Sequence, residues 1–148
     1  MTNFDDLIPE MREWNNGAGI DIRSWIGCMG NFRLAIGYST VFWPQFVEFE
    51  HFVLREGFSL KSLRGFEVQC NRDRQRVEGL MNHLHIADIQ FQGCEDITPE
   101  RVVHLGRVLR DIYRAKLAWQ FPSKRFDVHF AESPAQRLTD YVLTFVQI

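Results

Sequence analysis

The chain has 148 residues, 45% of them hydrophobic, and a formal net charge of -2 at pH 7. A chain of this length buries a core large enough to need no disulfide or structural metal, and its near-neutral charge argues against a general nucleic-acid binder or an acidic tail protein. With no internal repeat, low-complexity tract or linker, residues 1–148 are expected to form one domain.

The cysteines and the N-terminal residues indicate in which cellular compartment the protein works. Cys28, Cys70 and Cys94 lack CxxC spacing, which is typical of free thiols in a reducing environment. Cys28 has no local signature of a nucleophile and is expected to be a buried thiol. The opening MTNFDDLIPE lacks the basic start and apolar run of a signal peptide, and no stretch approaches the ~20 apolar residues that span a bilayer. We therefore expect a cytoplasmic protein with no membrane association.

The first third of the chain predicts short helices. Residues 9–15 begin with a proline suited to a first helical turn. Asp21 can cap a helical segment that runs through Ile26, and another helix should begin near Asn31. That helix cannot continue through Pro44, because proline lacks the amide donor and clashes with the preceding turn.

Residues 46–54, FVEFEHFVL, alternate with a period of two and predict one continuous strand. In such a strand Glu48, Glu50 and Phe52 share a face. Two acids on a strand face can perform acid-base catalysis when one has a raised pKa, but a solvated strand face is the commoner arrangement. The acids are bracketed by phenylalanines, and interfaces favour aromatic anchors, so a contact surface for a basic partner is the interpretation we favour.

Two helices should follow this strand. Ser59 can cap a short one, and residues 66–70 fit either its end or a short strand. Asn71 is expected to cap a second helix with one buried stripe at helical spacing. The members of that stripe are Val77, Leu80, Met81 and Leu84.

The last third predicts a long helix and two strands. Thr98, with a proline and an acid after it, is a strong helix start, and the helix should run to about Trp119. RFDVHF (125–130) alternates cleanly, whereas YVLTFVQI (141–148) is apolar on both faces, as in a central strand. The expected fold class is α+β, with several helices packed on a small antiparallel sheet that includes a C-terminal strand pair.

MNHLHIAD (81–88) contains the residue types of a metal site. The stretch is similar to the HxHxDH signature of the metallo-β-lactamase family, but Asp88 is one residue late and no histidine follows it. On a strand the two histidines would face the same way and could share a metal, but the apolar stripe from Val77 to Leu84 predicts that this stretch is helical. His83 and His85 then diverge by about 200° and cannot share an ion. A metal-dependent hydrolase centred on His83, His85 and Asp88 is therefore the alternative, and we expect no metal and no cofactor.

Arg107, Arg110 and Arg114 fall in one narrow sector of the long helix. Such a stripe can bind phosphate or nucleic acid. However, Asp111 lies four residues after Arg107, which permits ordinary helical ion pairing, and no nucleic-acid-binding motif accompanies the stripe. We rank a solvated face or docking to an acidic protein above nucleic-acid binding.

The absence of the common catalytic motifs favours a protein that is not an enzyme. The chain lacks GxSxG, a Walker loop and GxGxxG. We expect a non-enzymatic module whose partner is another protein. Its binding surface should lie at Glu48, Glu50 and Phe52, or at the stripe of Arg107, Arg110 and Arg114.

YSTVFWPQFVEFEHFVL (38–54) and VEGLMNHLHIADI (77–89) resemble segments of small, uncharacterised single-domain bacterial proteins. Some proteins of this kind are immunity proteins, which neutralise a toxin by tight binding. The resemblance implies an inhibitor that covers the active site of a toxin.

Overall fold

The computed structural model describes residues 2–90, 93–133 and 137–148. The chain divides into two compact units, Met1–Thr40 and Val41–Ile148. Helices combine with two small antiparallel sheets, so the predicted α+β class, with its C-terminal strand pair, is confirmed. The assignment of residues 1–148 to one domain stays a prediction. Within the described ranges, no helix has the length and apolar character needed to cross a bilayer.

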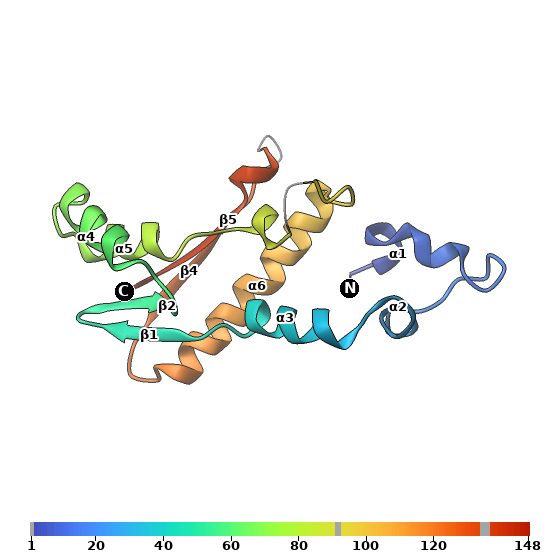
Figure 1. Ribbon diagram of the computed structural model, residues 1–148, viewed down its shortest axis with the longest axis horizontal. Coiled ribbons are helices and arrows are strands. Elements are labelled where there is room, and N and C mark those ends of the chain that lie inside the picture. Colours follow the sequence, from blue (N-terminus) through green and yellow to red (C-terminus); the bar gives the residue numbers. More distant parts are fainter. Residues whose placement is uncertain (1, 91–92, 134–136) are drawn as a thin grey trace. The chain divides into compact units, whose positions relative to one another are not determined.

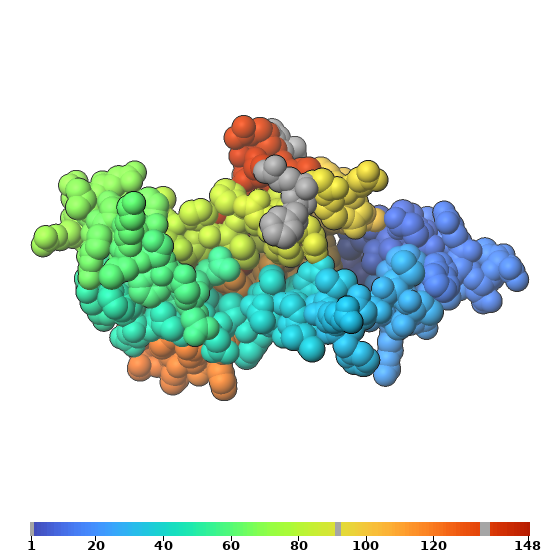
Figure 2. All heavy atoms as spheres, viewed as in Figure 1, coloured from blue at the N-terminus to red at the C-terminus, as the bar shows by residue number. Residues whose placement is uncertain are grey.

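The first unit consists of short helices. They are α1 (Phe4–Leu7), the 3-10 helix η1 (Pro9–Glu13), α2 (Ile22–Met29) and most of α3 (Phe32–Phe42). Asp21 caps α2 as predicted, and α3 begins near Asn31 as predicted. The Asn31 side chain accepts the Leu34 amide there. No residue of α2 or α3 is buried, and their atoms lie at the surface in Figure 2. The expectation that Cys28 is buried is therefore wrong.

The second unit begins with a β-hairpin. Its strands are β1 (Phe46–Phe49) and β2 (Phe52–Arg55), so the single strand predicted for 46–54 is wrong. The chain reverses at Glu50 and His51, where Glu50 has the left-handed φ of 55°. Two-residue hairpin turns usually place glycine, asparagine or aspartate at such positions. Because a glutamate stands here, the sequence did not predict the turn.

Two helices follow the hairpin, α4 (Leu60–Gln69) and α5 (Arg74–Met81). Ser59 caps α4 as predicted, but Asp73 rather than Asn71 caps α5. The predicted buried stripe is only partly right, because α5 ends at Met81 and Leu80 is exposed. The fully buried residues of α5 are Val77 and, unexpectedly, Glu78.

The larger sheet has the order β3-β5-β4, with β5 (Val142–Gln147) between β3 (Leu84–His85) and β4 (Phe126–Ala131). This confirms the predicted central strand. The long helix α6 (Pro99–Gln120) is capped by Thr98 as predicted and packs against β4 and β5 (Figure 1). Two 3-10 helices, η2 (Ile86–Ile89) and η3 (Leu138–Asp140), precede α6 and β5.

Buried side chains of α6 and of the larger sheet form the main hydrophobic core, together with residues of the hairpin. Phe145 of β5 packs edge-on against Phe46 of β1, with ring centroids 4.9 Å apart. Tyr113 of α6 meets the same Phe46 ring at 5.3 Å. The hairpin is thereby packed onto the helix and the sheet by aromatic contacts.

Polar side chains of α5 join the two sheets at their backbone edges. Glu78 accepts hydrogen bonds from the amide of Val53 in β2 at 2.9 Å and from the amide of Gln147 in β5 at 2.8 Å. Asn82 donates to the carbonyls of Val53 and Phe145 at 2.9 and 3.3 Å, and it accepts the Arg55 amide at 3.2 Å. Glu78 and Asn82, here called the α5 bridge, occupy the place that a strand between β2 and β5 would fill.

The α5 bridge should dominate stability. We expect Glu78→Ala to lower the free energy of unfolding by roughly 2–6 kcal/mol, at about 1–3 kcal/mol for each of two buried amides that lose their acceptor. Urea denaturation followed by circular dichroism measures this. Glu56→Ala is the control, because Glu56 is exposed and lies outside the bridge. Equal losses in the two variants would contradict the assignment.

Gly106 allows α6 to approach β4 closely. A Cβ atom at this position would lie 2.1 Å from Cζ of Phe130, far inside van der Waals contact. We expect Gly106→Ala to reduce the free energy of unfolding by about 1–3 kcal/mol through overpacking. Gly65→Ala in α4 is the matched control, since its Cβ position meets open space, and there alanine should stabilise the helix by about 0.5–1 kcal/mol. Stabilisation by both substitutions would refute the close approach.

Candidate protein-binding surface

His83 and His85 do not lie on a helix, so the geometric argument that separated them is wrong. α5 ends at Met81, and His85 lies in β3, where its Nδ1 is 2.7 Å from the Thr139 carbonyl. The two imidazole rings are neighbours, with centroids 5.1 Å apart. Asp88 does not complete a site with them: among residues 2–90, 93–133 and 137–148, no three histidine, cysteine, aspartate or glutamate side chains are grouped to hold a metal.

The three residues of the predicted surface lie on different parts of the hairpin: Glu48 on β1, Glu50 in the turn and Phe52 on β2. Phe52 is 0% exposed and packs in a second core cluster, so its predicted place on a binding surface is wrong. Its burial follows from the chain reversal, which turns β2 toward α5. Glu48 lies on β1 and pairs with Lys124 at 2.8 Å, whereas Glu50 lies in the turn.

Glu50 is held by a bidentate ion pair. Arg64 of α4 donates to its two carboxylate oxygens at 2.5 and 3.0 Å and also contacts Glu67 at 2.7 Å. The hydrogen bond from Arg64, with its positive charge, lowers the pKa of the Glu50 carboxyl. Acid-base catalysis by this pair of acids would need a raised pKa at one of them. The lowered pKa of Glu50 makes it a poor general acid at neutral pH.

The arginine stripe is tied into the surface of its own chain. Arg107 binds Glu132 through two hydrogen bonds of 2.9 and 3.2 Å. Arg110 pairs with Asp111 at 3.0 Å. Arg114 lies 3.8 Å from the same aspartate and donates to the Val128 carbonyl at 3.1 Å. Arg107 thus pairs with Glu132 and not with Asp111, which its spacing also permitted. Any partner that binds these arginines has to displace the contacts they already make.

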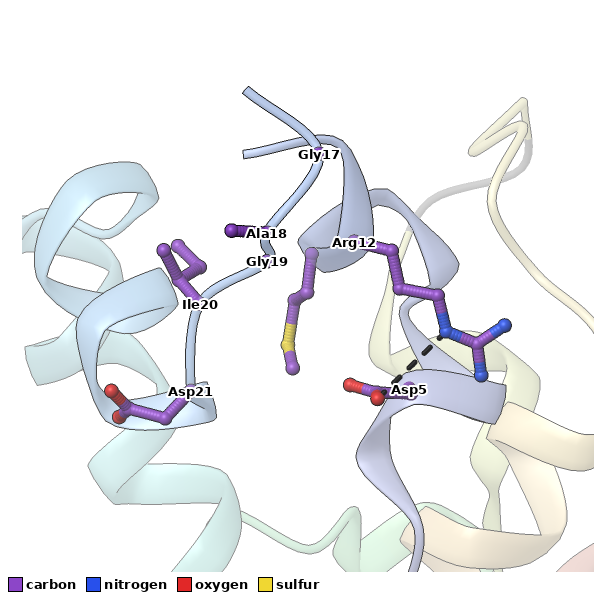
Figure 3. Close-up of a pocket in the computed structure, with 8 residues that line it drawn as sticks. Asp5, Arg12, Gly17, Ala18, Gly19, Ile20 and Asp21 are labelled. Atoms are coloured by element: carbon purple, nitrogen blue, oxygen red, sulfur yellow. Dashed lines mark ion pairs between the residues drawn. The ribbon is translucent and has the colours of Figure 1, made fainter. Parts of the chain in front are cut away.

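A pocket of about 420 Å³ lies in the first unit, lined in part by Asp5, Arg12 and Asp21 (Figure 3). Its charged groups already have partners. Arg12 lies 3.8 Å from Asp5 and 3.2 Å from Asp6, and Asp21 accepts the amides that begin α2, with its carboxylate directed away from Asp5. Each charged side chain that lines the pocket is therefore already bonded within the chain.

Trp43, Trp119 and Lys116, here called the Trp–Lys cluster, form an aromatic surface on the second unit. Lys116 of α6 places its ammonium 5.0 Å from the Trp43 ring and 4.6 Å from the Trp119 ring. The lysine is 2% exposed, whereas Trp43 and Trp119 are 46% and 69% exposed. The tryptophan rings, 6.1 Å apart, therefore cover the lysine and face outward themselves.

The sequence offered only a partial signal for this cluster. Lys116 and Trp119 are three residues apart, the spacing of neighbours on one helix face. Trp43 follows α3 and precedes the buried Pro44, and its approach to α6 depends on the tertiary fold. No family model, curated protein or solved structure matches the chain.

The Glu50–Arg64 pair gives a prediction for pH. Because the pKa of Glu50 is lowered in the folded protein, the stabilisation is present above the unfolded-state pKa and is lost as the pH falls through the folded-state pKa. Arg64→Met should raise the Glu50 pKa toward its ordinary value, as measured by NMR titration of the side-chain carbonyl carbon. Arg76→Met, at another exposed arginine, is the control. A Glu50 titration unaffected by Arg64→Met would show that the pair does not form in solution.

Proposed function

We propose that this chain is a non-enzymatic protein-binding module that contacts its partner through the Trp–Lys cluster. The observation that carries the proposal is the pair of exposed indoles that contact each other and the Lys116 ammonium. Tryptophan is enriched at the centres of protein interfaces and dominates their binding energy. Here both rings are already ordered by their contacts with the lysine, so binding has little side-chain entropy to remove.

The charged surfaces support binding less directly. Glu48, Glu50, Arg107, Arg110 and Arg114 each make an ion pair or hydrogen bond within the chain. Exposed ion pairs contribute little to binding affinity. A residue that gives up an ion pair within its own chain to form one with a partner protein adds even less binding energy. We therefore assign the anchoring role to the tryptophans and not to these charged residues.

The partner class that we test first is a protein toxin, on the resemblance of residues 38–54 and 77–89 to immunity proteins. Inhibition would work by occlusion: a rigid face presses two aromatic anchors onto the partner and covers its active site. No group of this chain takes part in bond making or breaking under this proposal.

We expect Trp119→Ala to weaken partner binding by roughly tenfold or more, as for a central interface residue. The measurement is quantitative capture from an extract of the source organism with immobilised wild type and variant, followed by titration calorimetry on any protein whose recovery falls. Val68→Ala is the matched control, because Val68 is an exposed apolar residue on α4, the green helix at the surface in Figure 2.

Lys116→Met separates the role of the charge from that of the rings. It removes the ammonium that orients the two indoles while keeping a similar side-chain length, so binding should fall less than in Trp119→Ala. Recovery of the same proteins at the same yield by wild type and Trp119→Ala would contradict binding through the Trp–Lys cluster.

A further inference from the structure

We propose that β4 pairs antiparallel with β4 of a second copy of this chain, about a twofold axis at Val128. β4 is an edge strand, because the order of the sheet is β3-β5-β4. It is six residues long and pairs with β5 in continuous register without a bulge. Strands of this kind are templates for further pairing unless charged side chains, proline, a bulge or a covering element protects them. Phe126–Ala131 contains no lysine or proline, and the Arg114 side chain is bonded to one carbonyl of this edge, that of Val128.

The hydrogen-bond pattern shows which backbone groups face outward. The Ile148 amide donates to the Arg125 carbonyl at 3.0 Å, which makes Arg125 and Ile148 a hydrogen-bonded pair with β5. Bonded and non-bonded pairs alternate along an antiparallel ladder. Phe126, Val128 and Phe130 therefore direct their amides and carbonyls toward the free edge. The bond from Arg114 to the Val128 carbonyl agrees with this direction.

Side chains favour one register for the second copy. Residues whose backbone groups point to the free edge have to lie opposite the same kind of residue in the second copy. Among the registers that allow this, those with the longest overlap of β4 on itself place the twofold axis either at Val128 or at His129. With the axis at Val128, Asp127 of each copy lies opposite His129 of the other in a non-bonded pair, where side chains approach most closely. With the axis at His129, two histidines face each other.

Asp127 and His129 are both exposed and lie on the sheet face opposite the buried Val128 and Phe130. The register at Val128 thus forms two Asp–His cross-strand pairs by symmetry, in which an imidazole N–H can donate a hydrogen bond to the carboxylate opposite. The side chains that β4 buries against α6 keep their positions, because pairing uses only the backbone edge. Arg114 would release the Val128 carbonyl to the second copy and keep its contact with Asp111.

A charge-exchange series tests the proposal on the full chain. Sedimentation equilibrium over a concentration series should show a reversible monomer–dimer equilibrium for the wild type. His129→Asp places like charges opposite each other twice and should weaken the dimer roughly tenfold or more, and the double variant Asp127→His/His129→Asp should restore it. His51→Asp is the control, because it makes the same substitution in the hairpin turn, outside β4, and should leave the dimer unchanged. Circular dichroism checks that each variant is folded.

Cysteine cross-linking tests the register. Oxidation of a mixture of Asp127→Cys and His129→Cys chains should give a cross-linked heterodimer through these two positions, identified by mass spectrometry of the joined peptides, since cysteines at non-bonded cross-strand positions lie within disulfide reach. Cross-linking of His129→Cys with itself would instead place the axis at His129 and overturn the register. A wild type that stays monomeric, or a dimer unaffected by His129→Asp, would overturn the pairing. Trp119→Ala should leave the dimer unchanged, so this result is independent of the proposed function.

Discussion

The arrangement of the second unit depends on one buried carboxylate. Glu78 has no exposed surface, yet its two oxygens accept backbone amides from β2 and β5 and a hydrogen bond from the Gln147 side chain. Asn82, one helical turn later, binds the neighbouring carbonyls of the same two strands. An isolated two-stranded hairpin is marginally stable in water. The α5 bridge bonds backbone groups at the edges of both sheets, and so joins the hairpin, α5 and the larger sheet to one another.

Rigidity at the candidate surfaces follows from this core. Lys116 and Trp119 lie close together near the C-terminal end of α6. The same helix buries Leu109, Tyr113 and Leu117 in the core. The hairpin is fixed to α6 by the contact of Phe46 with Tyr113 and by the hydrogen bond from Gln120 to the Phe46 carbonyl, 2.6 Å long. The segment from Trp43 to Phe46 is thus held close to the end of α6. A surface fixed in this way suits a protein that acts by binding, because little order has to be gained when the partner arrives.

Local signals in the sequence predicted the elements that depend on local chemistry. Asp21, Ser59 and Thr98 each cap a helix as expected, and the alternation of β4 and the apolar faces of β5 placed both strands correctly. The errors arose where tertiary structure overrides local pattern. Glu50 adopts a left-handed backbone usual for glycine, and α5 stops before His83 although its apolar spacing continues to Leu84. The α5 bridge could not be predicted, since Glu78 meets partners 25 and 69 residues away, and an acid at a helical position normally faces water. The Trp–Lys cluster was missed for the same reason.

Hydrogen exchange at single amides tests the α5 bridge most directly. If Glu78 joins the two sheets, the amides of Val53 and Gln147 should exchange only through global unfolding, with equal protection and the same dependence on denaturant. NMR on the native protein, with urea added in steps below the unfolding transition, measures both amides at once. Exchange of the Val53 amide through a local opening, while the Gln147 amide keeps full protection, would show that the hairpin moves apart from the sheet and would contradict the account.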